Sequence, residues 1–217
     1  MARKRHSFLL VSSLVQFTLF ALLARWARHH RQTLSEVIIS RRMQKDHSPF
    51  LRSLVVTVNR VVSSSGTINM LAVPGALLLW KKRLRVEAIV TLLMCWIGEL
   101  MKKVLKRIID RPRPNPLLVH VMSARKGKSF PSGDVASTVM LWGWLLCIGW
   151  WKSKERQGRK LALLGLPAFN IAFVGPARIY LGDHWLTDVL GGYLFGGGWL
   201  SLTLYLYRLW STRSQDA

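Results

Sequence analysis

Six long apolar segments alternate with short polar stretches along the chain. A helix that crosses a bilayer needs about 20 mostly apolar residues, and each segment approaches that length. The segments cover residues 8–24, 64–80, 86–104, 135–151, 161–177 and 189–207. Helices in lipid tolerate the prolines and glycines that interrupt some of them. The pattern predicts an all-α fold, a polytopic membrane bundle of about six transmembrane helices, with residues 1–217 as a single domain.

Two segments carry additional local signals. Residues 33–42 lie between the first two spans, and their spacing of Leu34, Val37 and Ile38 predicts an amphipathic helix on the membrane surface. Gly196, Gly197 and Gly198 in the last span would let a neighbouring helix pack closely.

The first apolar segment follows a basic stretch, as a cleaved signal peptide would. No clean cleavage site follows it, and Arg25, Trp26 and Arg28 are residue types that anchor a helix at the membrane interface. We therefore expect a retained first helix.

The charge of the chain supports the membrane assignment. Lys and Arg outnumber Asp and Glu by 32 to 10, for a net charge of +22, yet half of the residues are apolar. A nucleic-acid-binding protein would spread its basic residues over a polar chain, whereas here they cluster between apolar runs. Cys95 and Cys147 both lie within such runs, so neither a disulfide framework nor a metal site is expected.

The short basic loops predict the orientation of the bundle. Residues 81–85 and 152–160 are rich in Lys and Arg and fall on the same side as the basic N-terminus if there are six spans. The positive-inside rule makes that side cytoplasmic. The loops after the third and fifth spans then face the extracytoplasmic side of the cell membrane. The first loop, residues 25–52, is also basic, so the inverted topology stays an alternative.

Polar residues of one chemical kind gather in these two outward loops. A phosphoryl-transfer site needs cations to hold the phosphate oxygens and donors aimed at them. Lys106, Arg113 and Arg178 would supply the charge. Ser132 and Gly133 precede a predicted helix, so their N–H groups can point at an anion with the helix dipole behind them. These residues predict a phosphate-binding site.

His184 is the candidate nucleophile, because it alone among the six histidines stands beside such groups at the entrance of a span. Asp188 follows four residues later on the same helix face, where its carboxylate can orient the imidazole and stabilise its charged form. A histidine that attacks phosphorus needs no metal ion, so we expect no cofactor.

Each feature also has a purely structural interpretation. Ser132 could be only a helix N-cap, with Asp134 as a favourable acid in the first turn. Basic residues beside a span usually meet lipid headgroups. We expect this of Arg107, Arg111, Arg125, Lys126 and Lys128. The functional interpretation rests on the whole set of residues lying on loops that face one side.

The motifs Lys106-x6-Arg113-Pro114, Pro131-Ser132-Gly133 and Arg178-x5-His184-x3-Asp188 resemble the three-part signature of the type 2 phosphatidic acid phosphatase superfamily. This resemblance covers roughly residues 64–207. It implies a six-helix membrane bundle and metal-independent hydrolysis of a lipid phosphate through a phosphohistidine. It also implies site roles: Lys106, Arg113, Ser132, Gly133 and Arg178 bind phosphate, His184 attacks, and Asp188 supports it.

The chain departs from the family pattern at two positions. Ala177 replaces the usual serine, and Asp134 stands where the family usually has the histidine that protonates the leaving group. An alkoxide leaving group needs that proton, whereas a phosphate leaving group, with a pKa of about 6, needs little help. Nearby cations lower the pKa of Asp134 and a bound phosphate raises it, so the sign stays open. We therefore expect Asp134 to favour lipid diphosphates such as undecaprenyl diphosphate.

Several functions remain as alternatives. The same residues would serve a phosphatidate or phosphatidylglycerol-phosphate phosphatase. Without the acid histidine, the chain could also be a non-catalytic lipid-binding protein, although such a protein has little need for His184 with Asp188. A transporter would place more charged residues within its spans than are found around Glu99. The expected partners are the lipid substrate and membrane lipids, not nucleic acid.

Overall fold

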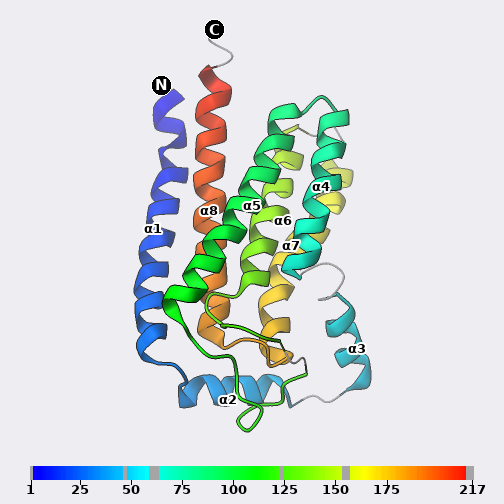
Figure 1. Cartoon of the computed structure of the whole chain (residues 1–217). Helices are drawn as coiled ribbons and strands as arrows, with labels where there is room; N and C mark the ends of the chain where they lie inside the picture. Colours follow the sequence, from blue (N-terminus) through cyan, green and yellow to red (C-terminus); the bar gives the residue numbers. More distant parts are fainter. Residues whose placement is uncertain (1, 46–47, 59–63, 123–124, 153–156, 214–217) are drawn as a thin grey trace.

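The computed structural model describes residues 2–45, 48–58, 64–122, 125–152 and 157–213, which form eight helices. Six long helices run side by side, and two short ones lie near one end of the bundle (Figure 1). The long helices are α1 (Ala2–His29), α4 (Ser65–Lys81), α5 (Arg85–Ile109), α6 (Gly133–Lys152), α7 (Gln157–Tyr180) and α8 (Leu186–Arg213). Each corresponds to one of the six expected spans, although α4 begins one residue after the expected start at 64, and the predicted all-α fold is confirmed.

Three helices are long and apolar enough by composition alone to cross a membrane, counted over the described residues. They are Ser7–His29, Gly133–Lys152 and Leu186–Ser211. Among the remaining long helices, α4 has only 17 residues, and α5 carries acidic and basic side chains near its ends. Pro74 lies within α4 and Pro167 within α7, and both helices continue through them.

Helix α8 lies between α1 and α6, and glycines make both contacts close. A Cβ atom at Gly196 would lie 2.8 Å from the backbone oxygen of Ala136 in α6. On another face of α8, the hydroxyl of Ser13 in α1 donates to the backbone oxygen of Gly198 at 2.9 Å. The predicted close packing at these glycines is confirmed.

The predicted surface helix is α2 (Leu34–Met43), which lies across the end of the bundle (Figure 1). Its buried face differs from the apolar one expected, because Glu36 is buried there beside Val37 and Ser40. Gln44 follows α2 and fixes it to the bundle, since its side-chain amide donates to the backbone oxygen of Tyr180 at 2.9 Å.

Helix α3 (Pro49–Val58) was not predicted from the sequence. Proline is favoured in the first turn of a helix, because its missing N–H has no partner there in any case. Pro49 followed by apolar residues was the available signal.

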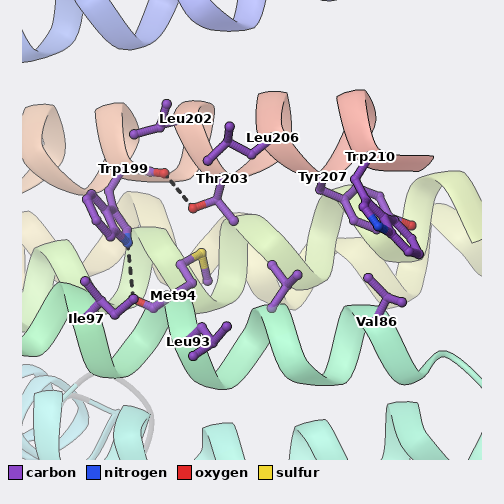
Figure 2. A pocket seen from close by; sticks show the side chains of 11 residues that line it. Val86, Leu93, Met94, Ile97, Trp199, Leu202, Thr203, Leu206, Tyr207 and Trp210 are labelled. Atoms are coloured by element: carbon purple, nitrogen blue, oxygen red, sulfur yellow. Dashed lines mark hydrogen bonds between the residues drawn. The ribbon is translucent and has the colours of Figure 1, made fainter. Parts of the chain in front are cut away.

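A cavity lined by apolar side chains lies between α5 and α8, and Figure 2 shows it from close by. The hydroxyl of Thr203 donates to the backbone oxygen of Trp199 at 2.9 Å, and the indole of Trp199 donates to the backbone oxygen of Met94 at 3.2 Å. The polar groups of Trp199 and Thr203 are thus used within the protein. The cavity follows the halves of α5 and α8 that are remote from the polar loops, so the chemistry must lie elsewhere.

Candidate active site

A second, polar pocket lies where α5 ends and α6 begins, beside the turn between α7 and α8. The loop after α5 and the turn after α7, which were expected to face the same side, both contribute residues to this pocket. The pocket is lined by Ser65, Glu99, Lys102, Lys103, Lys106, Arg113, Arg125, Gly133, Asp134 and His184. Five of these residues were predicted as site residues. The other three, Ser132, Arg178 and Asp188, are buried next to lining residues: Ser132 precedes Gly133, Arg178 pairs with Asp134, and Asp188 faces His184.

His184 lies in the turn between α7 and α8 and is almost fully buried. Its Nδ1 faces Asp188 Oδ2 at 3.6 Å, and its Nε2 faces Nη1 of Arg113 at 3.4 Å. Because arginine can only donate, Nε2 is the acceptor in this contact, and the imidazole proton belongs on Nδ1, towards Asp188. The unprotonated Nε2 is therefore on the side of the ring that faces Arg113 and the pocket.

Burial lowers the pKa of His184 to about 4. The Asp188 carboxylate opposes this shift by stabilising the charged ring, while the Arg113 charge adds to it. His184 is therefore neutral at physiological pH, which is the form in which Nε2 can attack an electrophile.

The depressed pKa of His184 also makes stability depend on pH. A histidine in an unfolded chain has a pKa of about 6.5. As the pH falls, the unfolded chain therefore takes up this proton before the folded protein does. The contribution of His184 to stability is fully present above about pH 6.5 and is lost as the pH falls towards 4. We expect the melting temperature of the native protein to fall relative to that of His184→Gln between about pH 7 and about pH 4.5. A constant difference across this range, measured in detergent, would contradict a neutral His184.

Asp188 is held on both of its carboxylate oxygens. Oδ1 pairs with Nη1 of Arg111 at 2.7 Å, and Oδ2 accepts the backbone N–H of Trp185 at 2.9 Å. Arg111 is fully buried, so the expectation that it meets lipid headgroups was wrong. Charge pairing with Asp188 explains why a guanidinium can be buried here.

Asp134 is buried between two guanidinium groups. Its Oδ2 lies 2.8 Å from Nη2 of Arg178 and 2.6 Å from Nη1 of Arg125, and its Oδ1 accepts the backbone N–H of Ser65 at 2.6 Å. Arg125 also approaches Asp183 at 3.4 Å. Arg125 is therefore a pocket residue, and its expected role as a headgroup contact was wrong.

The Ser132–Gly133 segment differs from its prediction in one respect. The backbone N–H of Ser132 donates to the backbone oxygen of Asp188 at 2.9 Å, so it does not point at the pocket. The Ser132 hydroxyl is buried, and among the described residues it has no hydrogen-bond partner, so it does not cap α6. A Cβ atom at Gly133 would meet only the side chain of Lys106, at 3.8 Å. Protein packing therefore does not require glycine here.

Lys102 lies within a predicted transmembrane segment and was not predicted as a site residue, but it lines the pocket. It is buried, its Nζ pairs with Glu99 at 2.7 Å, and it donates to the hydroxyl of Ser137. Its position one helical turn before Lys106 was the available signal, because residues four apart share a helix face.

The pocket carries an excess of positive charge. Five cationic side chains and two carboxylates line it, a net of three positive charges with His184 neutral. The cations are Lys102, Lys103, Lys106, Arg113 and Arg125, and the carboxylates are Glu99 and Asp134. Such a pocket attracts a polyanionic group.

The fold and the site define a helical membrane protein with an anion-binding pocket built around a histidine–carboxylate pair. Residues 87–211 match the PAP2 superfamily, and the chain belongs to that superfamily. It is similar to phosphatidylglycerophosphatase B of Bacillus subtilis (strain 168), with 26% identity over 185 residues that cover 83% of this chain and 87% of the relative.

A solved structure has the same fold. It is the crystal structure of a transmembrane PAP2-type phosphatidylglycerolphosphate phosphatase from Bacillus subtilis. The TM-score is 0.73 at 22% identity, and the match covers 90% of this chain and 96% of the other. The predicted membrane bundle and the resemblance stated from the motifs are thereby confirmed.

Proposed function

We propose that the chain is a metal-independent phosphatase that hydrolyses a lipid diphosphate or lipid phosphate through a phosphohistidine at His184. One observation carries the proposal: the unprotonated Nε2 of His184 faces a cationic pocket while Asp188 lies behind Nδ1. The name of the Bacillus subtilis relative, a phosphatidylglycerophosphatase, supports a phosphatase activity.

The reaction has two steps. Lys106, Arg113 and Arg178 bind the phosphate oxygens, and Nε2 of His184 attacks phosphorus as the bond to the leaving oxygen breaks. Asp188 stabilises the positive charge that the ring gains on phosphorylation. Water then cleaves the N–P bond, releases phosphate and restores the neutral imidazole. Lysine and arginine supply the charge that a metal ion would otherwise provide.

Asp134 favours a lipid diphosphate as substrate. The carboxylate has two guanidinium partners and one N–H donor, all of which stabilise its charged form. A carboxylate held in this way is a poor proton donor. A phosphate leaving group departs without a proton, whereas the alkoxide from a monoester requires one. The net charge of +3 in the pocket also suits a diphosphate, which carries more negative charge than a monophosphate.

The active site faces the extracytoplasmic side in this proposal. The loop between α4 and α5 is basic and, like Lys152 at the end of α6, lies at the opposite end of the bundle from the pocket. Under the positive-inside rule that end is cytoplasmic. A lipid substrate would reach the pocket with its headgroup at the outer surface.

Phosphatidylglycerol phosphate is the second candidate substrate, because the curated relative is named for it. The two candidates differ in the leaving group. Phosphate release by the purified protein, with chelator present, from undecaprenyl diphosphate, phosphatidylglycerol phosphate and phosphatidate side by side tests both. Turnover only of the diphosphate is the expected result. If all three lipids remain intact with folded protein, the chain is a lipid-binding protein instead.

The Asp134→His variant tests the explanation of this preference. A histidine there can protonate an alkoxide, so we expect monoester turnover to rise by about 100-fold relative to diphosphate turnover. Asp134→Asn is the matched control, because it removes the same charge without adding a proton donor, and it should leave the ratio unchanged. A ratio that does not change in Asp134→His would mean that Asp134 does not determine the leaving group.

A further inference from the structure

A buried polar network joins the surface helix α2 to Asp188. At its centre is Arg111, which uses all three of its guanidinium nitrogens. Nη1 donates to Asp188 Oδ1 at 2.7 Å and to the hydroxyl of Thr187 at 2.6 Å, while Nη2 donates to Glu36 Oε2 at 2.6 Å. Nε donates to the backbone oxygen of Arg31 at 3.2 Å. Arg111 thus connects the end of α1, α2 and the start of α8.

Glu36 is the far end of this network and is nearly as buried as Arg111. Besides the ion pair, its carboxylate accepts the hydroxyl of Thr33 at 2.9 Å and the backbone N–H of Thr187 at 3.3 Å. A buried carboxylate is costly unless it is paired and hydrogen-bonded. An apolar residue at this position would need no such partners, so the buried charge requires an explanation.

Charge sharing supplies that explanation. Arg111 carries one positive charge and faces two carboxylates, those of Glu36 and Asp188. Because Glu36 takes part of the pairing, Arg111 neutralises Asp188 only in part. Asp188 keeps negative charge for His184, whose ring becomes cationic when Nε2 is phosphorylated. The rigid fork of Arg111 also fixes the carboxylate of Asp188 in place behind Nδ1.

We infer that Glu36 is a positioning residue for the reaction: it acts through Arg111 on Asp188 and thereby on His184, and it makes helix α2 part of the active site. This inference rests on the proposed function. Glu36 touches neither the pocket nor the phosphate site, since Thr33, Thr187 and Arg111 surround its carboxylate. Its effect should therefore fall on the chemical step and not on phosphate binding.

The Glu36→Gln variant tests the inference, because it removes the charge and keeps the shape. We expect kcat to fall by about 10- to 100-fold, the size of effect that a small displacement of reacting groups produces. KM and the inhibition constant of inorganic phosphate should stay within about twofold, because Lys106, Arg113 and Arg178 are unchanged. Glu36→Asp, which restores the charge, should recover part of kcat.

Glu87→Gln is the matched control. Glu87 is also a buried carboxylate with a hydroxyl donor and a cation, Tyr207 and Lys152, but it lies at the opposite end of the bundle. It should lower the melting temperature without lowering kcat per folded molecule. If Glu36→Gln does not fold, Arg111→Lys replaces it, because lysine keeps the charge but cannot hold both carboxylates.

The outcomes separate the two proposals. A loss of kcat with unchanged phosphate inhibition supports the positioning role. Unchanged kcat, or a parallel loss of kcat and phosphate inhibition in folded protein, would overturn it. Full turnover in His184→Ala would instead contradict the proposed function, whatever Glu36→Gln does.

Discussion

The His184→Ala variant should release almost no phosphate from any lipid substrate, with a loss of about 10⁴-fold or more in kcat. Among the described residues that line the polar pocket, His184 is the one histidine; its Nε2 accepts from Arg113 and its Nδ1 faces Asp188. Without this nitrogen no N–P bond can form. Phosphate release from detergent-purified protein, compared at equal amounts of folded protein, measures the effect.

His120→Ala is the control for that experiment. His120 lies at the same end of the bundle, its side chain is exposed, and it is bound to Gln44 through its backbone oxygen and N–H. Its replacement should leave turnover unchanged. Activity that persists in His184→Ala would exclude His184 as the nucleophile.

Replacing Arg178 by Gln should have the second-largest effect. The Arg178 guanidinium is fully buried and pairs with Asp134 at 2.8 Å and with Asp183 at 2.9 Å. Its loss leaves Arg125 as the remaining guanidinium partner of Asp134 and Asp183, so we expect a loss of about 3 kcal/mol of stability, the lower end of the cost of breaking a buried ion pair. In the proposed mechanism it also removes one of the cations that bind the transferring phosphate, so we expect a further loss of about 10²- to 10³-fold in kcat.

Thermal unfolding and phosphate release in detergent measure the two effects of Arg178→Gln separately. Arg178→Lys should restore part of the stability but less of the activity, because lysine lacks the planar pair of donors. Arg107→Gln is the control for charge loss alone, since Arg107 is exposed on α5. A folded Arg178→Gln protein with full turnover would remove Arg178 from the phosphate site.

Local sequence patterns predicted much of the bundle and of the pocket. The apolar segments identified all six long helices, because a helix that packs in a membrane bundle needs a long run of mostly apolar residues. The motif spacing identified Lys106, Arg113, Gly133 and His184, which the structure brings together around one pocket. These four residues lie near the end of α5, the start of α6 and the turn before α8, and their distance from the apolar segments can be counted in the sequence.

The residues that were missed depend on pairing between distant segments. Arg111 looked like one of several interfacial basic residues, and only its contacts with Glu36 and Asp188 distinguish it from Arg107. Similarly, the partners of Asp134 come from two other segments, at Arg125 and Arg178. Hydropathy and local spacing contain no information on such pairs.

The Ser132 amide was misassigned for a related reason. The sequence placed it at a helix start, where N–H groups usually point at solvent or a ligand. The close approach of α8 instead provides a backbone acceptor, Asp188, at 2.9 Å. Tertiary contact thus took the donor that the local pattern had assigned to the phosphate.

Detection of the phosphorylated histidine tests the central proposal most directly. Excess enzyme is mixed with undecaprenyl diphosphate for a single turnover and quenched in alkali, where an N–P bond survives, and the modified peptide is located by mass spectrometry. We expect phosphate on His184 that appears and decays as free phosphate is released, and none in His184→Ala. Full phosphate release with no phosphate on His184 at any time, or phosphate on another residue, would contradict it.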